Sequence, residues 1–489
     1  MGDQVGRSAL AVRRPADVRR RLESSVAALA RMVEDGWFGH HEDTVGMEIE
    51  LDLVDPLGRP RLVNDAVLAR LERPDLQHEL GRFNIELNLP PQRMAPGALR
   101  GMESTLAATL AVGGLEAFGV RLAAIGTLPT LGAEELTRER LSSPTRYALL
   151  DQRMRAEKHG PVLVRIDGPE SLSFASESIA PEAAATSLQL HLRVPPDRYT
   201  DFYNAAQLVA AAQLAVGANS PYLLGRELWQ ETRLGLCEQV LDTRPRRAIR
   251  AGTPPRAWLG DRWVQGPVEL FGTIVRSQRP LLPTLTDEDP LAALAAGTAP
   301  TLQELRLHNG TVWRWNRPVY DVQGGRPQLR IENRVLPSGP TALDMVANAA
   351  FYFGLLRAVA DAELPPWRTT PFAVAGRDLH TAARLGLAAE LHWDGRDVPA
   401  PRLIQDLLLP LAGAGLDAWG LGAAERDRYL SVVAGRVRSG QTGARWQTAA
   451  VRRLEERAGL DRPAALREMT RRYVEQARTG APVHQWPLP

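Results

Sequence analysis

Strict alternation of apolar and polar residues marks the chain at four places. In the first, residues 45–53, apolar side chains at every odd position alternate with Glu48, Glu50 and Asp52. Successive side chains of a β-strand point to opposite faces, so this segment buries one face and lines the other with three carboxylates. Three like charges held close repel one another at neutral pH unless a metal ion or an arginine neutralises them. A solvated outer face is the simplest interpretation of one such strand, but the pattern recurs.

Three later strands repeat the alternation with other polar residues. Their polar positions are, in chain order, Asn84, Glu86 and Asn88; Gln189, His191 and Arg193; and Gln328, Arg330, Glu332 and Arg334. If the four strands are neighbours in one antiparallel sheet, their acids, histidine and arginines converge on one concave face. Carboxylates suit Mg²⁺ or Mn²⁺, and both ions tolerate one imidazole. Arginines beside them would bind an anion that also bridges the metal ions, as phosphoryl transfer requires.

Most of the remaining chain has helical spacing. Helices are expected within 1–40, with a basic outer face, and over about 97–119, 204–217 and 342–360. The segment His308-Asn309-Gly310-Thr311 is typical of a hairpin turn. One of Trp313 and Trp315 is expected in the core, because alternating aromatic residues usually pack inward.

The composition changes near Pro365-Pro366, where an arginine-rich helical region begins. The chain is too long for one ordinary domain. The predicted division is an N-terminal helix at 1–40, a catalytic domain at 41–364, and a helical C-terminal region at 376–489 that packs on it.

Composition narrows the classes of function. Hydrophobic residues make up 44% and charged residues 24%, as in soluble globular proteins, and the net charge of +2 gives no general attraction for nucleic acid or membrane. Lys158 is the only lysine, and its Glu157-Lys158-His159 context excludes a Walker A loop. We therefore expect any phosphate to be held by arginine, Mg²⁺ or backbone. Neither a secretory signal nor a membrane span is predicted, which favours the cytoplasm.

Other catalytic classes lack their sequence signatures. The single cysteine, Cys237, excludes a multi-cysteine zinc site and sits in a helical pattern, as a small core residue would. No His-Glu-x-x-His motif is present for a zinc protease. No Gly-x-Ser-x-Gly elbow is present either, although its absence alone does not exclude a Ser-His-Asp triad.

An ordered set of short motifs resembles the bacterial glutamate–cysteine ligase family 2, carboxylate–amine ligases with the glutamine synthetase-like fold. These motifs are Gly46-Met47-Glu48-Ile49-Glu50, Ile85-Glu86-Leu87, Gln189-Leu190-His191, Asn219-Ser220-Pro221 and Arg330-Ile331-Glu332-Asn333-Arg334. The resemblance covers about residues 45–360. It implies an α+β fold in which a six-stranded antiparallel sheet curves into a funnel, with flanking helices and ATP entering one end.

The resemblance also implies roles for individual residues. Glu48, His191 and Glu332 would hold the metal ion nearest the nucleotide phosphates, and Glu50 and Glu86 the ion nearer the amino-acid substrate. The implied catalytic arginines are Arg334, Arg330 and Arg317, and the implied nucleotide contacts are Gln189, Arg334 and Asn219.

The expected reaction is formation of a γ-glutamyl amide from glutamate and an amine such as cysteine, with ATP and Mg²⁺ (or Mn²⁺). Transfer of the γ-phosphoryl group to the carboxylate makes an acyl phosphate, which the amine can attack. The alternatives are the same chemistry with another acid or amine, a metal-dependent phosphohydrolase using the same acids, or a non-catalytic scaffold. Only small molecules are expected as partners, with neither nucleic acid nor membrane, and the sequence does not fix the oligomeric state.

Overall fold

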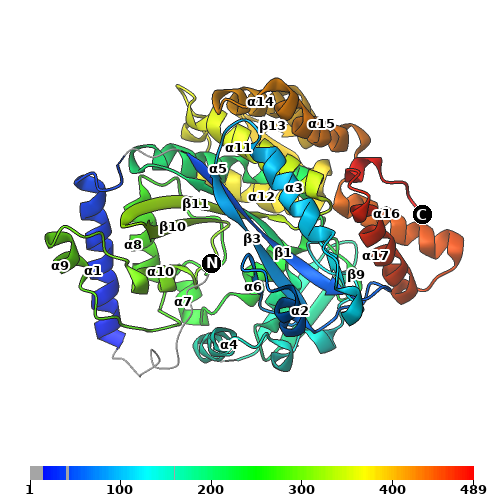
Figure 1. Cartoon of the computed structure of the whole chain (residues 1–489), viewed down its shortest axis with the longest axis horizontal. Helices are drawn as coiled ribbons and strands as arrows, with labels where there is room; N and C mark the ends of the chain where they lie inside the picture. The colour runs from blue at the N-terminus through cyan, green and yellow to red at the C-terminus, as the bar shows by residue number, and fades with distance from the viewer. Residues whose placement is uncertain (1–14, 40–42, 159) are drawn as a thin grey trace.

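One curled antiparallel sheet organises the protein. The structure, a computed structural model, describes residues 15–39, 43–158 and 160–489. The strands run in the order β10-β11-β7-β1-β3-β2, and β4 pairs with β1 off this path (Figure 1). Their bounds are β1 Thr44–Val54, β2 Leu76–His78, β3 Asn84–Arg93, β4 Arg121–Ala123, β7 Ser187–Arg193, β10 Asn316–Gln323 and β11 Arg326–Pro337. The expected α+β fold is confirmed, and the described residues contribute seven strands to the sheet rather than six.

The four alternating segments are strands, and they are neighbours. Glu50 lies opposite Glu86 in the β1–β3 pair, and Glu48 lies opposite Gln189 in the β1–β7 pair. In the β7–β11 pair His191 faces Glu332. Because all of these pairs are antiparallel and in register, their polar side chains share one face of the sheet.

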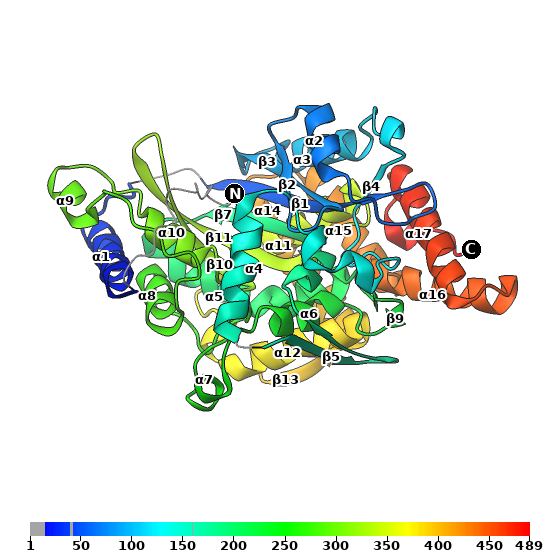
Figure 2. The same cartoon turned by 90° about the horizontal axis from the view of Figure 1, so that it is seen from below.

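Helices surround this sheet. The longer ones are α1 Pro15–Glu34, α3 Ala98–Leu110, α4 Thr145–Lys158, α5 Pro196–Gly217, α6 Thr232–Val240, α8 Pro267–Ser277, α11 Ala342–Ala360, α12 Phe372–Leu385, α14 Leu409–Ala418, α15 Ala423–Ser439, α16 Gly443–Ala458 and α17 Arg462–Arg478. Figures 1 and 2 show α1, α8, α9 (Pro290–Ala295) and α10 (Gln303–Asn309) grouped at one end, with α16 and α17 at the other. The helix expected over 97–119 ends at Leu110, and the C-terminal region also contains a β12–β13 hairpin (Glu390–Trp393 and Arg396–Pro399).

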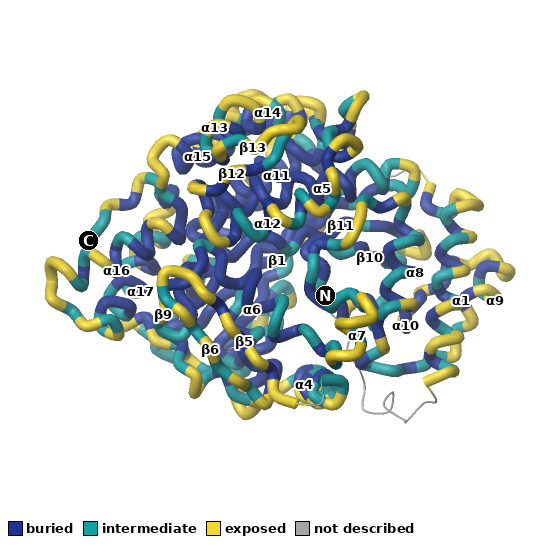
Figure 3. Tube along the Cα trace, turned by 180° about the vertical axis from the view of Figure 1, so that it is seen from behind, coloured by how far each residue is buried: buried dark blue, intermediate teal, exposed yellow. Residues whose placement is uncertain are grey.

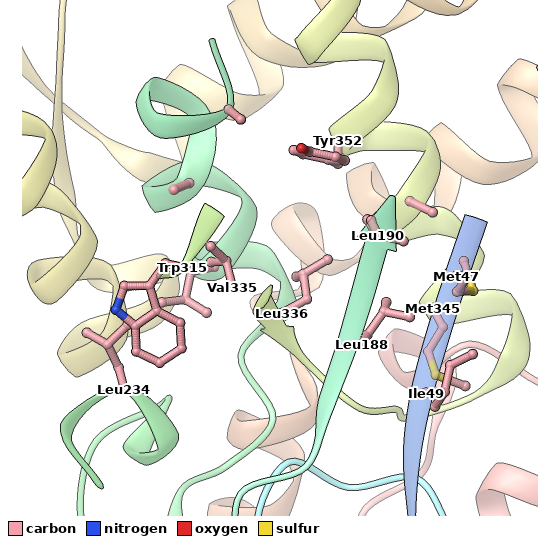
Figure 4. Close-up of a cluster of buried hydrophobic side chains, with 14 of the residues drawn as sticks. Met47, Ile49, Leu188, Leu190, Leu234, Trp315, Val335, Leu336, Met345 and Tyr352 are labelled. Carbon is pink, nitrogen blue, oxygen red and sulfur yellow. The ribbon is translucent and has the colours of Figure 1, made fainter. Parts of the chain in front are cut away.

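The apolar face of the sheet forms the core with α11. Met47, Ile49, Leu188 and Leu190 project from β1 and β7 on the side of the α11 residue Met345 (Figure 4). All of these side chains are buried. Figure 3 shows the buried trace concentrated around α5, α11 and the sheet. Burial of this face leaves the polar face of the same strands for a cavity.

One helix among the described residues, α11, is long and apolar enough to cross a membrane. The protein instead encloses this helix: 83% of its most apolar 18-residue stretch is buried. The helix contacts α5, α14, α15 and α3. A helix that is apolar all round and packed on several sides is typical of a protein core.

The predicted hairpin turn at 308–311 is wrong. Residues Gln303–Asn309 form helix α10, and the Asn309 side chain donates a hydrogen bond to the carbonyl of Pro318 at 2.7 Å. The actual turn between β10 and β11 is Gly324-Gly325, where both residues have positive φ, which glycine adopts without steric strain. Trp315 is buried in the core as expected for one of the pair, and Trp313 is only partly buried.

The predicted division into three regions stays a prediction. Helix α1 packs against α8, α9 and α10, and the C-terminal helices α14 and α15 pack on α11. Residues 1–14 and 40 of the expected N-terminal region, and residues 41, 42 and 159 of the expected catalytic domain, lie outside the described residues.

Candidate active site

The polar face of the sheet lines a cavity of about 830 Å³. Strands β1, β3, β7, β10 and β11 supply its floor, and Arg146, Tyr147 and Leu150 of α4 supply part of its wall. Of the residues predicted for the site, eight line this cavity: Glu48, Glu50, Glu86, Gln189, His191, Arg317, Arg330 and Arg334. Glu332 is buried beneath them and Asn219 lies elsewhere.

Three carboxylates meet at one end of the floor, here called the acid end. Glu50, Glu79 and Glu86 each place an oxygen within 4.8 Å of the others. Burial, together with the neighbouring carboxylates, raises the pKa of Glu79 well above its usual value, and burial also raises the pKa of Glu50. Buried acids that repel one another in this way are stabilised by a divalent cation.

Neutral donors hold these carboxylates in position. The backbone N–H and hydroxyl of Ser187 donate to Glu50 at 2.7 and 2.8 Å, and the amide of Gln189 donates to it at 2.8 Å. Asn88 donates to Glu86 at 2.8 Å, and Gln77 donates to the same oxygen. The acid end is therefore built to a fixed geometry, as a metal site requires.

Glu48 and His191 lie side by side near the middle of the floor. His191 Nε2 is 3.2 Å from Glu48 Oε1. Burial disfavours the charged form of Glu48, but nearby positive charges, among them His191 and Arg317, together with a hydrogen bond to His191 outweigh it and hold the pKa of Glu48 well below its usual value. Neither buried ring nitrogen of His191 has a hydrogen bond of good geometry within the described part of the chain. A buried imidazole nitrogen needs such a partner, and a metal ion would provide one.

Two arginines bind Glu332 from both sides, and we call this group the arginine end. Arg317 Nη2 donates to Glu332 Oε2 at 2.8 Å, and Arg334 Nη1 donates to Oε1 at 2.5 Å. Burial opposes ionisation, yet these guanidinium groups outweigh it and lower the pKa of Glu332 to about 2. Arg334 also donates to Gln189 at 2.7 Å, which links the arginine end to Glu50.

The predicted convergence of Glu48, His191 and Glu332 on one ion stays a prediction: His191 lies beside Glu48 and opposite Glu332 in the sheet. Both oxygens of Glu332 are occupied by arginines, and the described residues bring only Glu50, Glu79 and Glu86 together as a close ligand group. Glu332 is thus held as a buried carboxylate between two guanidinium groups.

Further arginines continue beyond the arginine end. Arg330 lines the cavity and lies opposite Arg193 in the β7–β11 pair, and its guanidinium is 3.8 Å from Asp321. Burial and the neighbouring charges of Arg326 and Arg330 lower the pKa of Arg193. Several positive charges gathered beside a cavity favour an anion with more than one negative charge.

A family comparison identifies the family of the chain. The model of the glutamate-cysteine ligase family 2 matches residues 44–477, which include every strand of the sheet. The chain belongs to this family. The resemblance drawn from the motifs is thereby confirmed, and the protein is a member of a ligase family.

Solved structures share the fold of this family member. It is similar to the glutamate–cysteine ligase of Francisella tularensis solved in complex with AMP, with a TM-score of 0.57 and 13% identity over 92% of this chain and 91% of that one. It is also similar to a bifunctional glutathione synthetase from Pasteurella multocida, with a TM-score of 0.49 and 11% identity over 93% of this chain and 55% of that one. At these identities the first likeness shows the fold alone, and the second TM-score is too low to add to it. No curated protein matches the chain by sequence.

The placement of Asn219 corrects one prediction for this family member. Asn219 is fully buried, and its amide donates to the Ser338 carbonyl at 2.7 Å and to the Tyr473 hydroxyl at 2.8 Å, while its side-chain oxygen accepts from Gln447 at 2.8 Å. These bonds use the side chain to join the turn after α5 to helices α16 and α17. Asn219 does not line the cavity, so it is not placed to contact a nucleotide there.

Four carboxylates that line the cavity were not predicted from the sequence: Asp75, Glu79, Glu182 and Asp321. Among them, Glu79 and Glu182 have a pKa that the nearby charge of Glu50 helps to raise. Glu79 lies in the turn between β2 and β3, and Glu182 lies in the short helix Ala180–Ala184. Burial and the nearby charge of Glu50 raise the pKa of Glu182 to about 7. Neither residue belongs to an alternating strand, so the period-two pattern that revealed the other acids gives no signal for them.

Cys237 is a core residue, as predicted. It is buried in α6, where burial raises the pKa of its thiol, so it is not the nucleophile of the cavity.

Proposed function

We propose that this protein is an ATP-dependent ligase that joins the γ-carboxylate of glutamate to the amine of cysteine. Membership of the ligase family supports the reaction type. The observation that carries the proposal is the junction at Gln189, whose side chain bonds both Glu50 of the acid end and Arg334 of the arginine end. A carboxylate and a phosphoryl group held at the two ends would meet there.

The residue types at the acid end fit Mg²⁺, and Mn²⁺ would suit them equally. We propose Glu50, Glu79 and Glu86 as ligands of one ion, and Glu48, His191 and Glu332 as the candidates for a second. When bound, such ions neutralise charge on the oxygens of the phosphates and of the substrate carboxylate.

The arginines would stabilise the phosphoryl group in transfer. We propose that Arg334 and Arg317 donate to the transferring group, that Arg330 donates to the remaining phosphates, and that Gln189 orients Arg334. The γ-phosphoryl passes to an oxygen of the substrate carboxylate and ADP leaves. The amine nitrogen then forms a bond to the carbonyl carbon, the carbon–oxygen bond to phosphate breaks, and the amine loses one proton.

A measurement of product formation tests this proposal. Protein incubated with Mg·ATP, glutamate and cysteine should release ADP and phosphate in equal amounts and form γ-glutamylcysteine, detected by mass spectrometry. Without cysteine, turnover should fall at least about tenfold, because the acyl phosphate has no acceptor. Release of phosphate at the same rate with and without amine would instead establish a metal-dependent phosphohydrolase. A cytoplasmic location is part of the proposal, because ATP is the co-substrate.

A further inference from the structure

A small side pocket opens from the cavity where the two ends meet. Six residues line both spaces, among them Glu50, Glu182 and Arg334. The inner part of the side pocket, beyond these shared residues, is lined by Ser187, Arg233, Cys237, Ala257 and Trp315. The pocket thus opens beside Glu50 and Arg334, the residues proposed to flank the reacting carboxylate.

Among the described residues, the interior of the side pocket contains no charged side chain that is unpaired. Its one inner charged residue, Arg233, is paired with Glu231 at 2.5 Å and donates to the carbonyl of Val335 at 2.7 Å. The other inner walls are apolar apart from Ser187, whose hydroxyl is bonded to Glu50. A charged group entering this pocket would lose its hydration without gaining a partner, so the pocket favours an uncharged group.

The side pocket is also small. Its volume is about 30 Å³, which is room for about two water-sized groups. A methyl group or the CH2–SH group of cysteine fits this space, whereas a branched or aromatic side chain does not.

The far wall of the side pocket is fixed. The indole of Trp315 donates to Glu238 at 3.2 Å, and its backbone carbonyl accepts from the N–H of Arg334 at 2.8 Å. Figure 4 shows the ring packed beside Leu234 and Val335. A wall held by packing and by hydrogen bonds resists widening, so the pocket limits what can enter.

A carboxylate without a partner stands at the mouth of the side pocket. Glu50 is committed to Ser187 and Gln189, but the Glu182 carboxylate has no hydrogen bond or ion pair with any described residue. A carboxylate in this state attracts an amino group. The mouth and the interior together therefore match an amine that carries a small uncharged substituent.

We propose that the side pocket receives the side chain of the amine acceptor and that Glu182 pairs with the amino group of that acceptor. This inference rests on the proposed ligase function and refines it. It restricts the acceptor to amino compounds whose side chain has about two non-hydrogen atoms or fewer, and it assigns Glu182 to acceptor binding. Cysteine meets this limit, and so do alanine and serine.

Hydroxylamine separates the two proposals in the wild-type protein. It attacks an acyl phosphate to give a hydroxamate and phosphate, and it has no side chain to place. With Mg·ATP and glutamate, hydroxamate should form, and kcat/KM for alanine and cysteine should exceed that for leucine and phenylalanine at least tenfold. If no hydroxamate or amide forms with any amine, the ligase function itself is wrong. If hydroxamate forms but leucine reacts as well as alanine, only the side-pocket assignment is wrong.

Two substitutions should shift the size limit in opposite directions. Ala257→Val fills the pocket, so the ratio of alanine transfer to hydroxamate formation should fall at least tenfold. Leu241→Ala enlarges it, so the ratio of valine transfer to alanine transfer should rise at least tenfold. Ala465→Val, the same change at a buried alanine of α17 outside the cavity, should alter neither ratio. If one variant does not fold, the other and the wild-type amine series still decide, and unchanged ratios in a folded variant overturn the assignment.

Glu182→Gln tests the amino-group contact with nearly the same shape. The KM for cysteine should rise at least tenfold while kcat changes much less. Hydroxylamine is largely uncharged at neutral pH, so its KM should change less than that of cysteine. Equal changes in both KM values would assign Glu182 to the glutamate or metal subsite and overturn its role toward the acceptor.

Discussion

The two ends of the cavity floor use the same carboxylate side chain in opposite charge environments. At the acid end Glu50, Glu79 and Glu86 face one another and are held by neutral amides and hydroxyls, and the pKa values of Glu50 and Glu79 are raised. At the arginine end Glu332 lies between Arg317 and Arg334, and its pKa is lowered to about 2. One face of the sheet therefore holds the acid end, whose carboxylates need a cation from solution, beside the arginine end, whose carboxylate is neutralised by arginines of the chain.

The two ends are therefore expected to contribute differently to the stability of the fold. The acids of the acid end repel one another, so they weaken the metal-free fold and gain only when a cation binds. The buried pair of the arginine end is part of the fold, because removing one partner leaves an unbalanced buried charge. Substitutions at the two ends should therefore change stability in opposite directions.

The largest effect is expected from Glu332→Gln. Loss of this charge leaves Arg317 and Arg334 without their counter-ion, so the free energy of unfolding should fall by about 3 kcal/mol and ATP turnover should be lost. Urea denaturation and ADP release would measure the two effects. Glu456→Gln, on the exposed face of α16, is the matched control and should change neither. Normal turnover by the Glu332→Gln variant would show that Glu332 is not part of the active site.

Arg334→Lys should lower kcat about 100- to 1000-fold. Lysine keeps the charge but loses the planar guanidinium, whose Nη1 donates to both Glu332 and Gln189 and whose other N–H groups we propose for a phosphoryl oxygen. Steady-state ADP release measures the change, with the exposed Arg247→Lys as the control. A near-normal kcat would show that another arginine contacts the phosphoryl group.

Glu79→Gln should weaken Mg²⁺ activation at least about tenfold while stabilising the metal-free protein. A raised pKa means that folding disfavours the charged form, so the penalty grows as the pH rises above the unfolded value of about 4.5 and is present at pH 7. Removal of this charge should raise the free energy of unfolding by about 1 kcal/mol in EDTA. A Glu79→Gln variant less stable than wild type would show that the acid end is not under charge repulsion.

The smallest effect concerns helix α10, which contributes Arg306, Leu307 and Asn309 to the cavity wall. Burial and the charge of Arg256 lower the pKa of His308 to about 3, below its unfolded value of 6.5. The unfolded chain therefore binds a proton that the folded chain does not, and stability falls as the pH drops from 6.5 toward 3. Between pH 7 and 6 the free energy of unfolding should fall by about 0.7 kcal/mol more for wild type than for His308→Gln, as measured by urea denaturation. Equal losses would show that His308 has the same pKa in the folded and the unfolded chain.

Alternation was a reliable guide to the sheet because it is a local property. Side chains two apart share a face whatever the strand pairs with, so Glu48 and Glu50 could be placed on one face of their strand, and Glu86 and His191 on the polar faces of theirs, from the sequence. Helix α11, predicted over 342–360, has those same bounds in the structure. The hairpin expected at 308–311 failed because Gly310 ends a helix there, and a short polar segment with glycine suits both structures.

The sequence by itself therefore determined which residues share the polar face of each strand, since the strand repeat fixes this without any tertiary contact. Only the tertiary structure decided which strands are neighbours, and so which acids meet a second acid and which meet an arginine. It also brought Glu79 and Glu182 into the cavity from a turn and a short helix, and it buried Asn219 against the C-terminal helices. Those outcomes depend on contacts between distant parts of the chain, on which local periodicity places no constraint.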